Sequence, residues 1–352
     1  MNFDLGHNLE YYRSIAHRAY PQCMVANASS RIRVLLRRSF KGVIALALLL
    51  SVVGVWLWFN PHTLYRVITI AGHWNAGLSE RSVEIQGHRW RVLDSDPDTT
   101  APESMRTVLA LHGLGTSAEA MLSIASMVPE NARVLIPDLP GFGEHATHGT
   151  VVHNAAFYLE AIHDFQVHEK LGRVDVVGTS MGGALAVAYA VRYPTLVRSL
   201  VLLSPAGVTA PKQNDFMRRV VAGEIPLDIK DESSLREVLR LNFVHQPPMP
   251  PPIRAAFIER AIERREAYLR IVEDMRPLLT TGLEQLLPSL STPTLVLYGA
   301  NDQLTDPSMI EVFRRDVPNI QSAIISDAGH VLSYDAPAKV ADAMRAFYRS
   351  IN

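Results

Sequence analysis

The chain has 352 residues, of which 48% are hydrophobic, and its 34 lysines and arginines nearly balance 35 aspartates and glutamates. Such a balance gives no long-range attraction for nucleic acid or for highly charged substrates, so neither is expected as a partner. The lone cysteine, Cys23, excludes an internal disulfide, and the sequence has no cysteine and histidine cluster with zinc spacing. The length suits one main domain with an appendage.

An uncharged apolar run extends from Gly42 to Phe59, and about 18 to 20 such residues can cross a bilayer. Basic residues precede the run and aromatic residues mark its far end: Arg31, Arg33, Arg37, Arg38 and Lys41, then Trp56, Trp58 and Tyr65. Basic flanks stay cytoplasmic and aromatic rings anchor at the interface. We therefore predict a single-pass signal-anchor over residues 42–60, with a cytoplasmic N-terminus and the rest of the chain on the non-cytoplasmic side.

Two alternatives exist for this run, a cleaved signal peptide and a buried core helix. A signal peptide has a short leader and an apolar stretch of about 7 to 15 residues, whereas residues 1–41 come first here. A core helix normally has polar positions along one side, and this run has only Ser51. The membrane anchor is favoured, with residues 1–41 as a basic tail and residues 61–81 as a linker.

From about residue 82, short apolar runs alternate with longer helical patterns, which is typical of βαβ units around a parallel sheet. The predicted strands are Ser82–Gln86, Trp90–Leu93, Thr107–Leu111, Arg133–Ile136, Arg173–Val177, Arg198–Leu203, Thr294–Leu297 and Ser322–Ile325. The predicted helices are Ser117–Met127, Val152–Leu171, Met181–Tyr193, Pro307–Arg315 and Pro337–Ser350. The first two strands, separated by Gly87 and His88, favour an antiparallel hairpin on an otherwise parallel sheet.

The alternation stops between the sixth and seventh strands, where residues 209–289 are polar and helical. A proline cluster divides this region and cannot lie in a helix interior: Pro247, Pro248, Pro250, Pro251 and Pro252. We predict a helical cap inserted into an α/β core made of residues 82–208 and 290–352.

The strongest motif is Val177-Gly178-Thr179-Ser180-Met181-Gly182-Gly183, a GxSxG directly after a predicted strand and directly before a predicted helix. This context is that of a nucleophile elbow, a turn so tight that the positions two away from the serine must lack side chains. Gly178 and Gly182 meet that requirement. Ser180 would then project from the sheet at a helix N-terminus, where free N–H groups favour negative charge.

A serine hydroxyl needs a histidine base that is oriented by a carboxylate, and in this type of fold they follow in the order serine, acid, histidine. Asp302 follows the seventh predicted strand and His330 follows the eighth. The C-terminal edge of such sheets is where their sites gather. We predict Asp302 as the acid and His330 as the base, with Asp306 and Asp327 as alternative acids.

An oxyanion hole requires two backbone N–H donors, one from the residue after the nucleophile and one from the loop after the third strand. Met181 supplies the first. The loop after the third predicted strand begins His112-Gly113-Leu114-Gly115, which makes the Leu114 amide the second. His112 precedes a sharp turn and is expected to hold this loop by hydrogen bonding rather than to transfer protons.

Two other patterns in the sequence are relevant to cofactor binding. Gly113-Leu114-Gly115-Thr116-Ser117-Ala118 matches the GxGxxA form of a dinucleotide fingerprint, with Asp138 about 20 residues on. The match leaves the serine, aspartate and histidine order unexplained and recurs from Gly141 to Ala146, so no dinucleotide is expected. His145, His148 and His153 lack acidic or cysteine ligands at supporting spacing, so no metal is expected.

Together the motifs resemble those of the α/β-hydrolase superfamily over residues 82–352. They are HG at 112–113, DLPGFG at 138–143, GTSMGG at 178–183, SPAG at 204–207, GANDQ at 299–303 and AGH at 328–330. Within the superfamily the chain is similar to membrane-anchored monoacylglycerol lipases and to bacterial lipases and esterases. This resemblance implies Ser180 as nucleophile, Asp302 as acid, His330 as base, and the Leu114 and Met181 amides as oxyanion hole.

The expected function is a serine hydrolase that cleaves carboxylic esters through an acyl-enzyme on Ser180, with no cofactor. A membrane anchor beside a cap favours lipophilic esters such as monoacylglycerols, which could reach the site from the lipid bilayer. Two alternatives remain at this point. One is a hydrolase of carbon–carbon bonds in ring-cleavage products, which similar families perform with the same triad. The other is a non-catalytic binding protein with a hydrolase fold.

Overall fold

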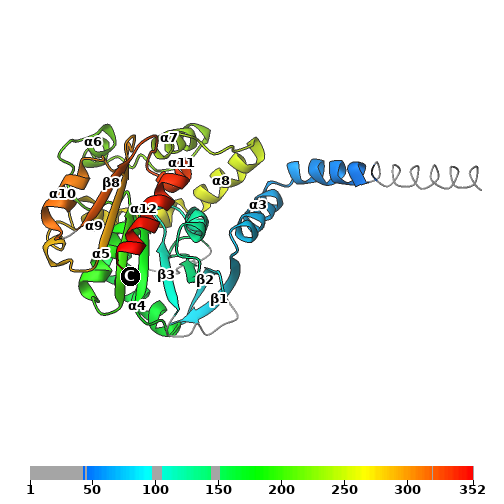
Figure 1. Cartoon of the computed structure of the whole chain (residues 1–352). Helices are drawn as coiled ribbons and strands as arrows, with labels where there is room; N and C mark the ends of the chain where they lie inside the picture. Colours follow the sequence, from blue (N-terminus) through cyan, green and yellow to red (C-terminus); the bar gives the residue numbers. More distant parts are fainter. Residues whose placement is uncertain (1–42, 44–45, 97–104, 144–150, 319, 352) are drawn as a thin grey trace, which may run out of the picture. The chain divides into compact units, whose positions relative to one another are not determined.

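The computed structural model describes residues 43, 46–96, 105–143, 151–318 and 320–351 (Figure 1). The chain divides into two compact units, Met1–Asn60 and Pro61–Asn352. The α/β domain and its cap belong entirely to the second unit. The predicted basic tail, residues 1–41, lies outside the described residues.

In the first unit the described helix spans Leu46–Trp58. No single helix among the described residues is long and apolar enough to cross a membrane; this helix and Pro61–Asn75 meet the criteria only together, as a pair with a bend between them. Proline lacks an N–H and disfavours helical backbone in the residue before it, which explains why the helix stops ahead of Pro61. Residues 42, 44 and 45 of the predicted anchor, residues 42–60, lie outside the described residues.

Eight strands form one sheet, in the order β1-β2-β4-β3-β5-β6-β7-β8. β1 pairs antiparallel with β2, and β2 pairs antiparallel with β4, whereas the other neighbours are parallel. The predicted fold class is confirmed, and only the strand ends differ from expectation. The strands are β1 (Ser79–Ile85), β2 (His88–Asp94), β3 (Arg106–Leu111), β4 (Ala132–Pro137), β5 (Val174–Thr179), β6 (Val197–Leu203), β7 (Thr294–Gly299) and β8 (Gln321–Ile325).

The predicted hairpin is confirmed, with β1 and β2 joined through Gln86 and Gly87, which have φ angles of 53° and 77°. Two consecutive positive φ angles characterise the type I′ turn, whose twist matches that of the strands on either side. The segment 61–81 is not a simple linker, because it contains helix α3 (Pro61–Asn75) and the start of β1.

The helices that follow the strands are α4 (Ala155–His168), α5 (Met181–Arg192), α10 (Met309–Asp316), α11 (Leu332–Asp335) and α12 (Pro337–Ser350). The predicted helix Ser117–Met127 is present as a 3₁₀ helix, η1 (Ala118–Ser126). The predicted helix Val152–Leu171 begins later because the Asn154 side chain accepts from the Phe157 N–H at 3.0 Å and caps the first turn.

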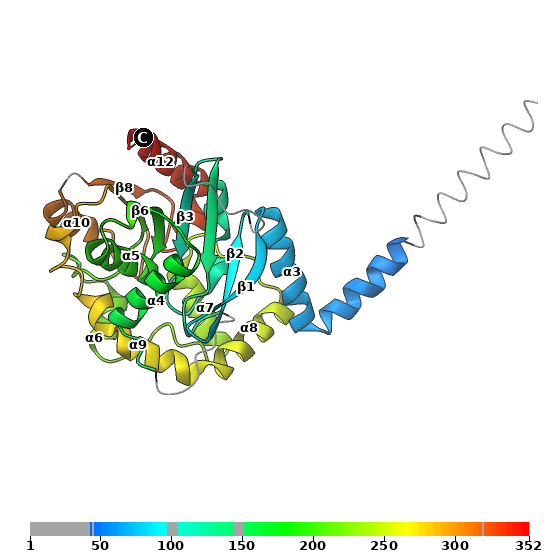
Figure 2. The same ribbon diagram turned by 90° about the horizontal axis from the view of Figure 1, so that it is seen from below.

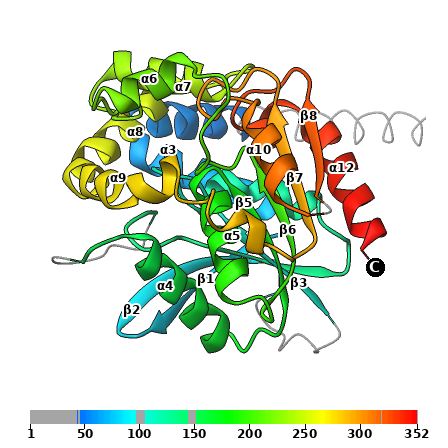
Figure 3. The ribbon, with the colours of Figure 1, turned by 90° about the vertical axis from the view of Figure 1, so that its left-hand side faces the viewer.

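Side chains of the central strands alternate between two buried cores, as a period of two requires. In β3, Leu109 and Leu111 belong to the core formed with α4, α5 and α10, whereas Val108 and Ala110 belong to the core formed with η1 and α12. The sheet is therefore covered on both faces (Figure 3). Burial on both faces explains why these strands are continuous apolar runs.

The cap region, residues 209–289, is helical as predicted and contains α6 (Asp215–Val221), α7 (Glu232–Asn242), α8 (Pro251–Glu263), α9 (Arg265–Thr280) and the 3₁₀ turn η2 (Leu287–Ser289). Figure 3 shows α6, α7, α8 and α9 gathered at one end of the sheet. Pro251 and Pro252 open α8, at positions whose N–H groups have no helical partner. Pro277 lies inside α9, which the sequence pattern did not indicate.

Helix α3 lies beside α8, as Figure 2 also shows. His62 approaches Glu259 at 3.0 Å, and the Arg260 guanidinium lies 5.3 Å from the centre of the Tyr65 ring. Farther along α3, the buried His73 contacts Glu119 of η1 at 3.1 Å. Side chains of α3 thus bind both the cap and the segment after β3.

Candidate active site

Ser180 occupies the turn between β5 and α5 that the GxSxG motif predicts. A Cβ atom on Gly178 would lie well under 3.0 Å from the Gly182 carbonyl, and one on Gly182 would lie equally close to the Leu111 carbonyl. These are backbone atoms of the turn and of β3, which cannot move aside independently. Both positions therefore require glycine, as the tight turn implied.

The backbone of Ser180 has φ 55° and ψ −116°, a conformation that costs free energy for any residue with a side chain. Neighbouring backbone holds it there. Its N–H donates to the Leu203 carbonyl at 3.0 Å, and its own carbonyl accepts from the Ala206 N–H at 3.3 Å. Ser180 also sits at the N-cap of α5, where the helix dipole favours negative charge. The turn therefore holds the half-buried Ser180 at a fixed place.

His330 and Asp302 form a buried pair. The Nδ1 atom of His330 lies 2.9 Å from Asp302 Oδ2 and 3.1 Å from Oδ1, and both side chains are almost completely buried. Asp302 also accepts from the Leu304 N–H at 2.9 Å, and from the N–H and hydroxyl of Thr305 at 3.0 Å and 2.7 Å. Four donors on one carboxylate hold it in one orientation.

The two alternative acids are engaged elsewhere. Asp306 Oδ1 accepts from the Ser308 N–H at 2.9 Å. Asp327 pairs with His245 at 3.2 Å, and both side chains are more than half exposed. Of the three acids that the sequence left open, the structure places Asp302 against His330.

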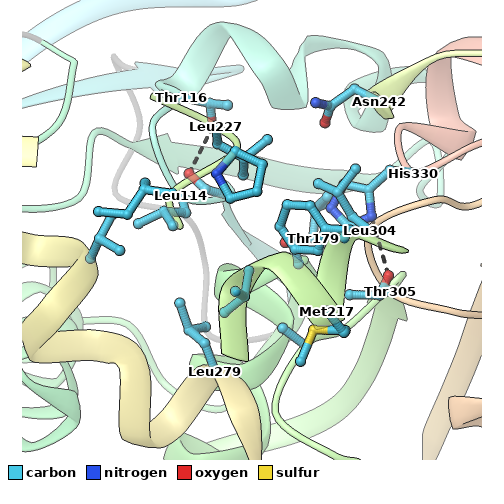
Figure 4. Close-up of a pocket in the computed structure, with 18 of the residues that line it drawn as sticks. Leu114, Thr116, Thr179, Met217, Leu227, Asn242, Leu279, Leu304, Thr305 and His330 are labelled. Atoms are coloured by element: carbon cyan, nitrogen blue, oxygen red, sulfur yellow. Dashed lines mark hydrogen bonds between the residues drawn. The ribbon is translucent and has the colours of Figure 1, made fainter. Parts of the chain in front are cut away.

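Ser180 and His330 line the same pocket, and Figure 4 shows His330 there, close to Thr305. Their side chains share no hydrogen bond among the interactions of the described residues. Catalytic hydrogen bonds are often long without substrate and tighten in the substrate complex. The pocket thus brings together Ser180 and a histidine that is paired with a carboxylate.

The two predicted oxyanion donors lie at this pocket. Leu114 lines it, and Met181 directly follows Ser180 as the first residue of α5. In the described part of the chain no group accepts a hydrogen bond from either amide N–H, as expected for Met181, whose amide starts a helix. Neither amide thus has a partner among the described residues, as an oxyanion donor requires.

His112 holds the loop that carries Leu114, as predicted. Its Nδ1 lies 2.9 Å from the Gly113 carbonyl, and its Nε2 accepts from the Leu139 N–H at 3.0 Å. Burial lowers the pKa of His112, which keeps the imidazole neutral with its proton on Nδ1. Thr116 adds a hydroxyl bond to the same Gly113 carbonyl at 2.8 Å. This histidine is occupied by the backbone and has a positioning role.

A cluster of charged side chains contacts the residues that follow this loop. Arg91 donates to Asp138 at 3.1 Å and also binds Glu119, while Asp138 accepts from the Ala118 N–H at 2.8 Å. Burial alone would raise the pKa of Glu119, but its hydrogen bond and charge attraction with Arg91 outweigh that effect and lower the pKa to about 2. Because Asp138 is buried and paired, it is not placed as a ribose-binding acid, and the dinucleotide pattern reflects a tight loop.

The pocket over Ser180 measures about 150 Å³ and is mostly apolar. Its apolar lining from the cap was not identified by sequence reasoning: Phe216, Met217, Val220, Ile225, Pro226, Leu227, Tyr268, Val272 and Leu279. The cap also contributes Glu224, Asn242, Arg276 and Thr280 to the lining. The spacing of Met217 and Val220, and of Tyr268 and Val272, is that of one helix face. This periodicity was the available signal, although it does not reveal which partner a helix face covers.

No group of three or more histidine, cysteine or acidic residues in the described ranges is arranged to hold a metal ion. Of the three histidines considered for metal binding, His145 and His148 lie outside those ranges. His153 is buried and packs edge-on against Phe157, with 5.0 Å between ring centres.

Known proteins similar to this chain were found in three comparisons. A family profile described as the alpha/beta hydrolase fold matches residues 106–337. Lipase 1 of Psychrobacter immobilis is 29% identical over 69% of this chain and 77% of its own length. The human monoacylglycerol lipase ABHD6 is 26% identical over 88% of this chain and 94% of its own length. The crystal structure of a membrane phospholipase A, a bacterial virulence factor, shows 31% identity, a TM-score of 0.77, and coverage of 88% of this chain and 98% of that chain.

The chain therefore belongs to the α/β-hydrolase fold family. It is an ester hydrolase of the lipase and esterase type.

Proposed function

We propose that the protein cleaves lipophilic carboxylic esters of the monoacylglycerol type through an acyl-enzyme on Ser180. The observation that carries this proposal is the position of Ser180, beside the His330 and Asp302 pair, at one apolar pocket closed by the cap. Within the domain division we propose, residues 82–208 and 290–352 supply the chemistry and residues 209–289 supply the pocket wall.

We propose the following steps. Ser180 Oγ attacks the ester carbonyl while His330 accepts its proton, and Asp302 stabilises the imidazolium through Nδ1. The Leu114 and Met181 amides donate to the oxyanion, and each such donor is worth about 2.7 to 4 kcal/mol in the transition state. His330 then protonates the leaving alcohol. Water, deprotonated by His330, attacks the acyl-enzyme and releases the fatty acid.

The lining of the pocket favours a lipophilic acyl group, because apolar side chains from α6, α9 and the loop after α6 predominate there. Each methylene moved from water into such a lining contributes about 0.8 kcal/mol. Relatives named as lipases and monoacylglycerol lipases support the same class of substrate.

The substrate class is tested with the purified full-length protein on p-nitrophenyl esters from acetate to palmitate, and on a monoacylglycerol. We expect kcat/KM to rise about tenfold or more from acetate to the medium or long chains. Leu279→Trp, which fills part of the pocket, should lower activity on long chains more than on acetate. A preference for acetate, or cleavage of a vinylogous diketone without ester hydrolysis, would contradict the proposal.

We further propose that residues 42–60 attach the protein to a membrane, with the N-terminus cytoplasmic and the hydrolase domain on the other side. Two features support attachment. The apolar run is uncharged, and the described helix within it exposes its large apolar side chains. Helix α3, which follows at once, exposes Val67, Ile68, Ile70 and Trp74 by 46 to 87%, as interfacial helices do.

Replacing Leu48 and Val52 together by arginine is expected to move the protein from the membrane to the soluble fraction. Each arginine near the centre of a spanning segment costs about 2.5 to 3.5 kcal/mol. Alkaline carbonate extraction followed by immunoblotting measures the distribution. Val167→Arg with Val221→Arg is the matched control, because it adds the same charge at two exposed valines of the hydrolase unit. Equal extraction of the wild type and both variants would exclude an anchor.

A further inference from the structure

Asp335 is a carboxylate outside the predicted triad that binds three backbone amides at once. Its Oδ2 accepts from the Gly329 N–H at 2.8 Å and from the Val244 N–H at 3.0 Å, and its Oδ1 accepts from the His245 N–H at 2.9 Å. Asp335 ends α11, the short helix just after His330. Hydrogen bonds from amides to a carboxylate are charge-assisted and about twice as strong as neutral ones.

The three amides come from two parts of the fold. Gly329 immediately precedes His330, whereas Val244 and His245 belong to the cap, just after α7. A backbone bond adds a second link, because the Val331 N–H donates to the Asn242 carbonyl at 3.0 Å. Asn242 lines the same pocket as His330 (Figure 4). The segment that carries His330 is thus bound on both sides to the end of α7.

The close approach depends on the absence of a side chain at residue 329. A Cβ atom on Gly329 would lie 3.0 Å from the Asn242 carbonyl oxygen and 3.2 Å from Asp335 Oδ2. Beside these bonds, the Phe243 and Tyr334 rings pack edge to face, with 5.3 Å between their centres. Together, Gly329, the Asp335 carboxylate and the two rings form one contact between the cap and the loop that carries His330.

We infer that Asp335 is a positioning residue for His330. It holds the backbone next to His330 at a fixed position relative to the cap. This inference rests on the proposed function. Asp302 orients the imidazole ring through Nδ1, but it does not hold the backbone from which the ring projects. Asp335 holds that backbone. The same carboxylate binds Val244 and His245, so the cap segment at the pocket and the base beside it are fixed together.

The test compares the wild type, Asp335→Asn and Asp327→Asn. In Asp335→Asn one oxygen becomes an NH₂ group that cannot accept from an amide. Asp327→Asn is the matched control, because Asp327 lies in the same loop and also contacts His245, but through an exposed pair. Exposed pairs contribute little to stability. The measurements are the rate of Ser180 labelling by a fluorophosphonate, kcat and KM on p-nitrophenyl butyrate, and Tm.

We expect Asp335→Asn to lower the labelling rate and kcat by about ten- to a hundredfold, since a displacement near 1 Å at a catalytic group has such an effect. KM and Tm should change little, and Asp327→Asn should resemble the wild type. Wild-type labelling rates in folded Asp335→Asn would overturn the inference, as would a fall in Tm without slower labelling.

Asp335→Glu is a second variant for the case in which Asp335→Asn does not fold. It keeps the charge but adds a methylene, so the carboxylate cannot reach all three amides without moving Gly329. Slower labelling in folded Asp335→Glu supports the positioning role, and an unchanged rate contradicts it. A wild type that is not labelled, while Tm shows that it is folded, would contradict the proposed function itself and this inference with it.

Discussion

Ser180→Ala is expected to abolish fluorophosphonate labelling and to lower ester hydrolysis by at least about 10⁴-fold. The substitution removes only the hydroxyl group that is proposed to form the acyl-enzyme. The remaining oxyanion donors and pocket retain a modest rate enhancement over water. Labelling of membrane fractions, followed by hydrolysis assays on the purified protein, measures both effects.

Ser204→Ala is the matched control for this experiment. Ser204 is another buried serine with positive φ, 47°, at the end of the neighbouring strand β6, and its hydroxyl has no hydrogen-bond partner among the described residues. Its removal should leave labelling unchanged, since no interaction is lost. Equal labelling of the wild type and Ser180→Ala would show that another residue is the nucleophile.

Asp302→Asn is expected to lower kcat by about 10⁴-fold with little effect on KM. The asparagine side chain fits the same space, but its NH₂ group favours the wrong tautomer of His330. The NH₂ group would also face hydrogen-bond donors of Leu304 and Thr305 that now point at a carboxylate. Steady-state kinetics on one medium-chain ester, with Tm to monitor folding, measures the effect.

Asp306→Asn and Asp327→Asn complete the comparison, because both acids follow the nucleophile in the chain and neither contacts His330 in the structure. Each should retain activity close to that of the wild type. If Asp306→Asn were inactive and Asp302→Asn active, the acid would have been assigned to the wrong residue.

The arrangement of the sheet could be predicted because its strands are buried on both faces, so each one is a short apolar run. The elbow could be predicted for a local reason, since Gly178, Ser180 and Gly182 all act within one turn. Strand ends and helix starts were less accurate, because they depend on single caps. Asn154, for example, delays the start of α4 through its bond to the Phe157 N–H.

Contacts distant in sequence could not be derived. The bonds of Asp335 to Val244 and His245 join segments about 90 residues apart, and no local pattern indicates them. The choice of Asp302 over Asp306 is of the same kind, because four residues separate two chemically equal candidates and only the tertiary fold brings one to His330. Helix α3 was not predicted either, because its contacts with the cap and with η1 join segments that lie far apart in the sequence.

Helix α3 affects how a shorter version of this enzyme should be made for crystallisation or assay. The sheet begins only at Ser79, which makes the residues after α3 an obvious place to start an expressed chain. That boundary would remove His73 and its contact with Glu119. Glu119 and its partner Arg91 would then lose the helix that covers them. The same boundary would also remove Tyr65 and His62, which contact the cap. An expression boundary at Pro61 retains all of these contacts.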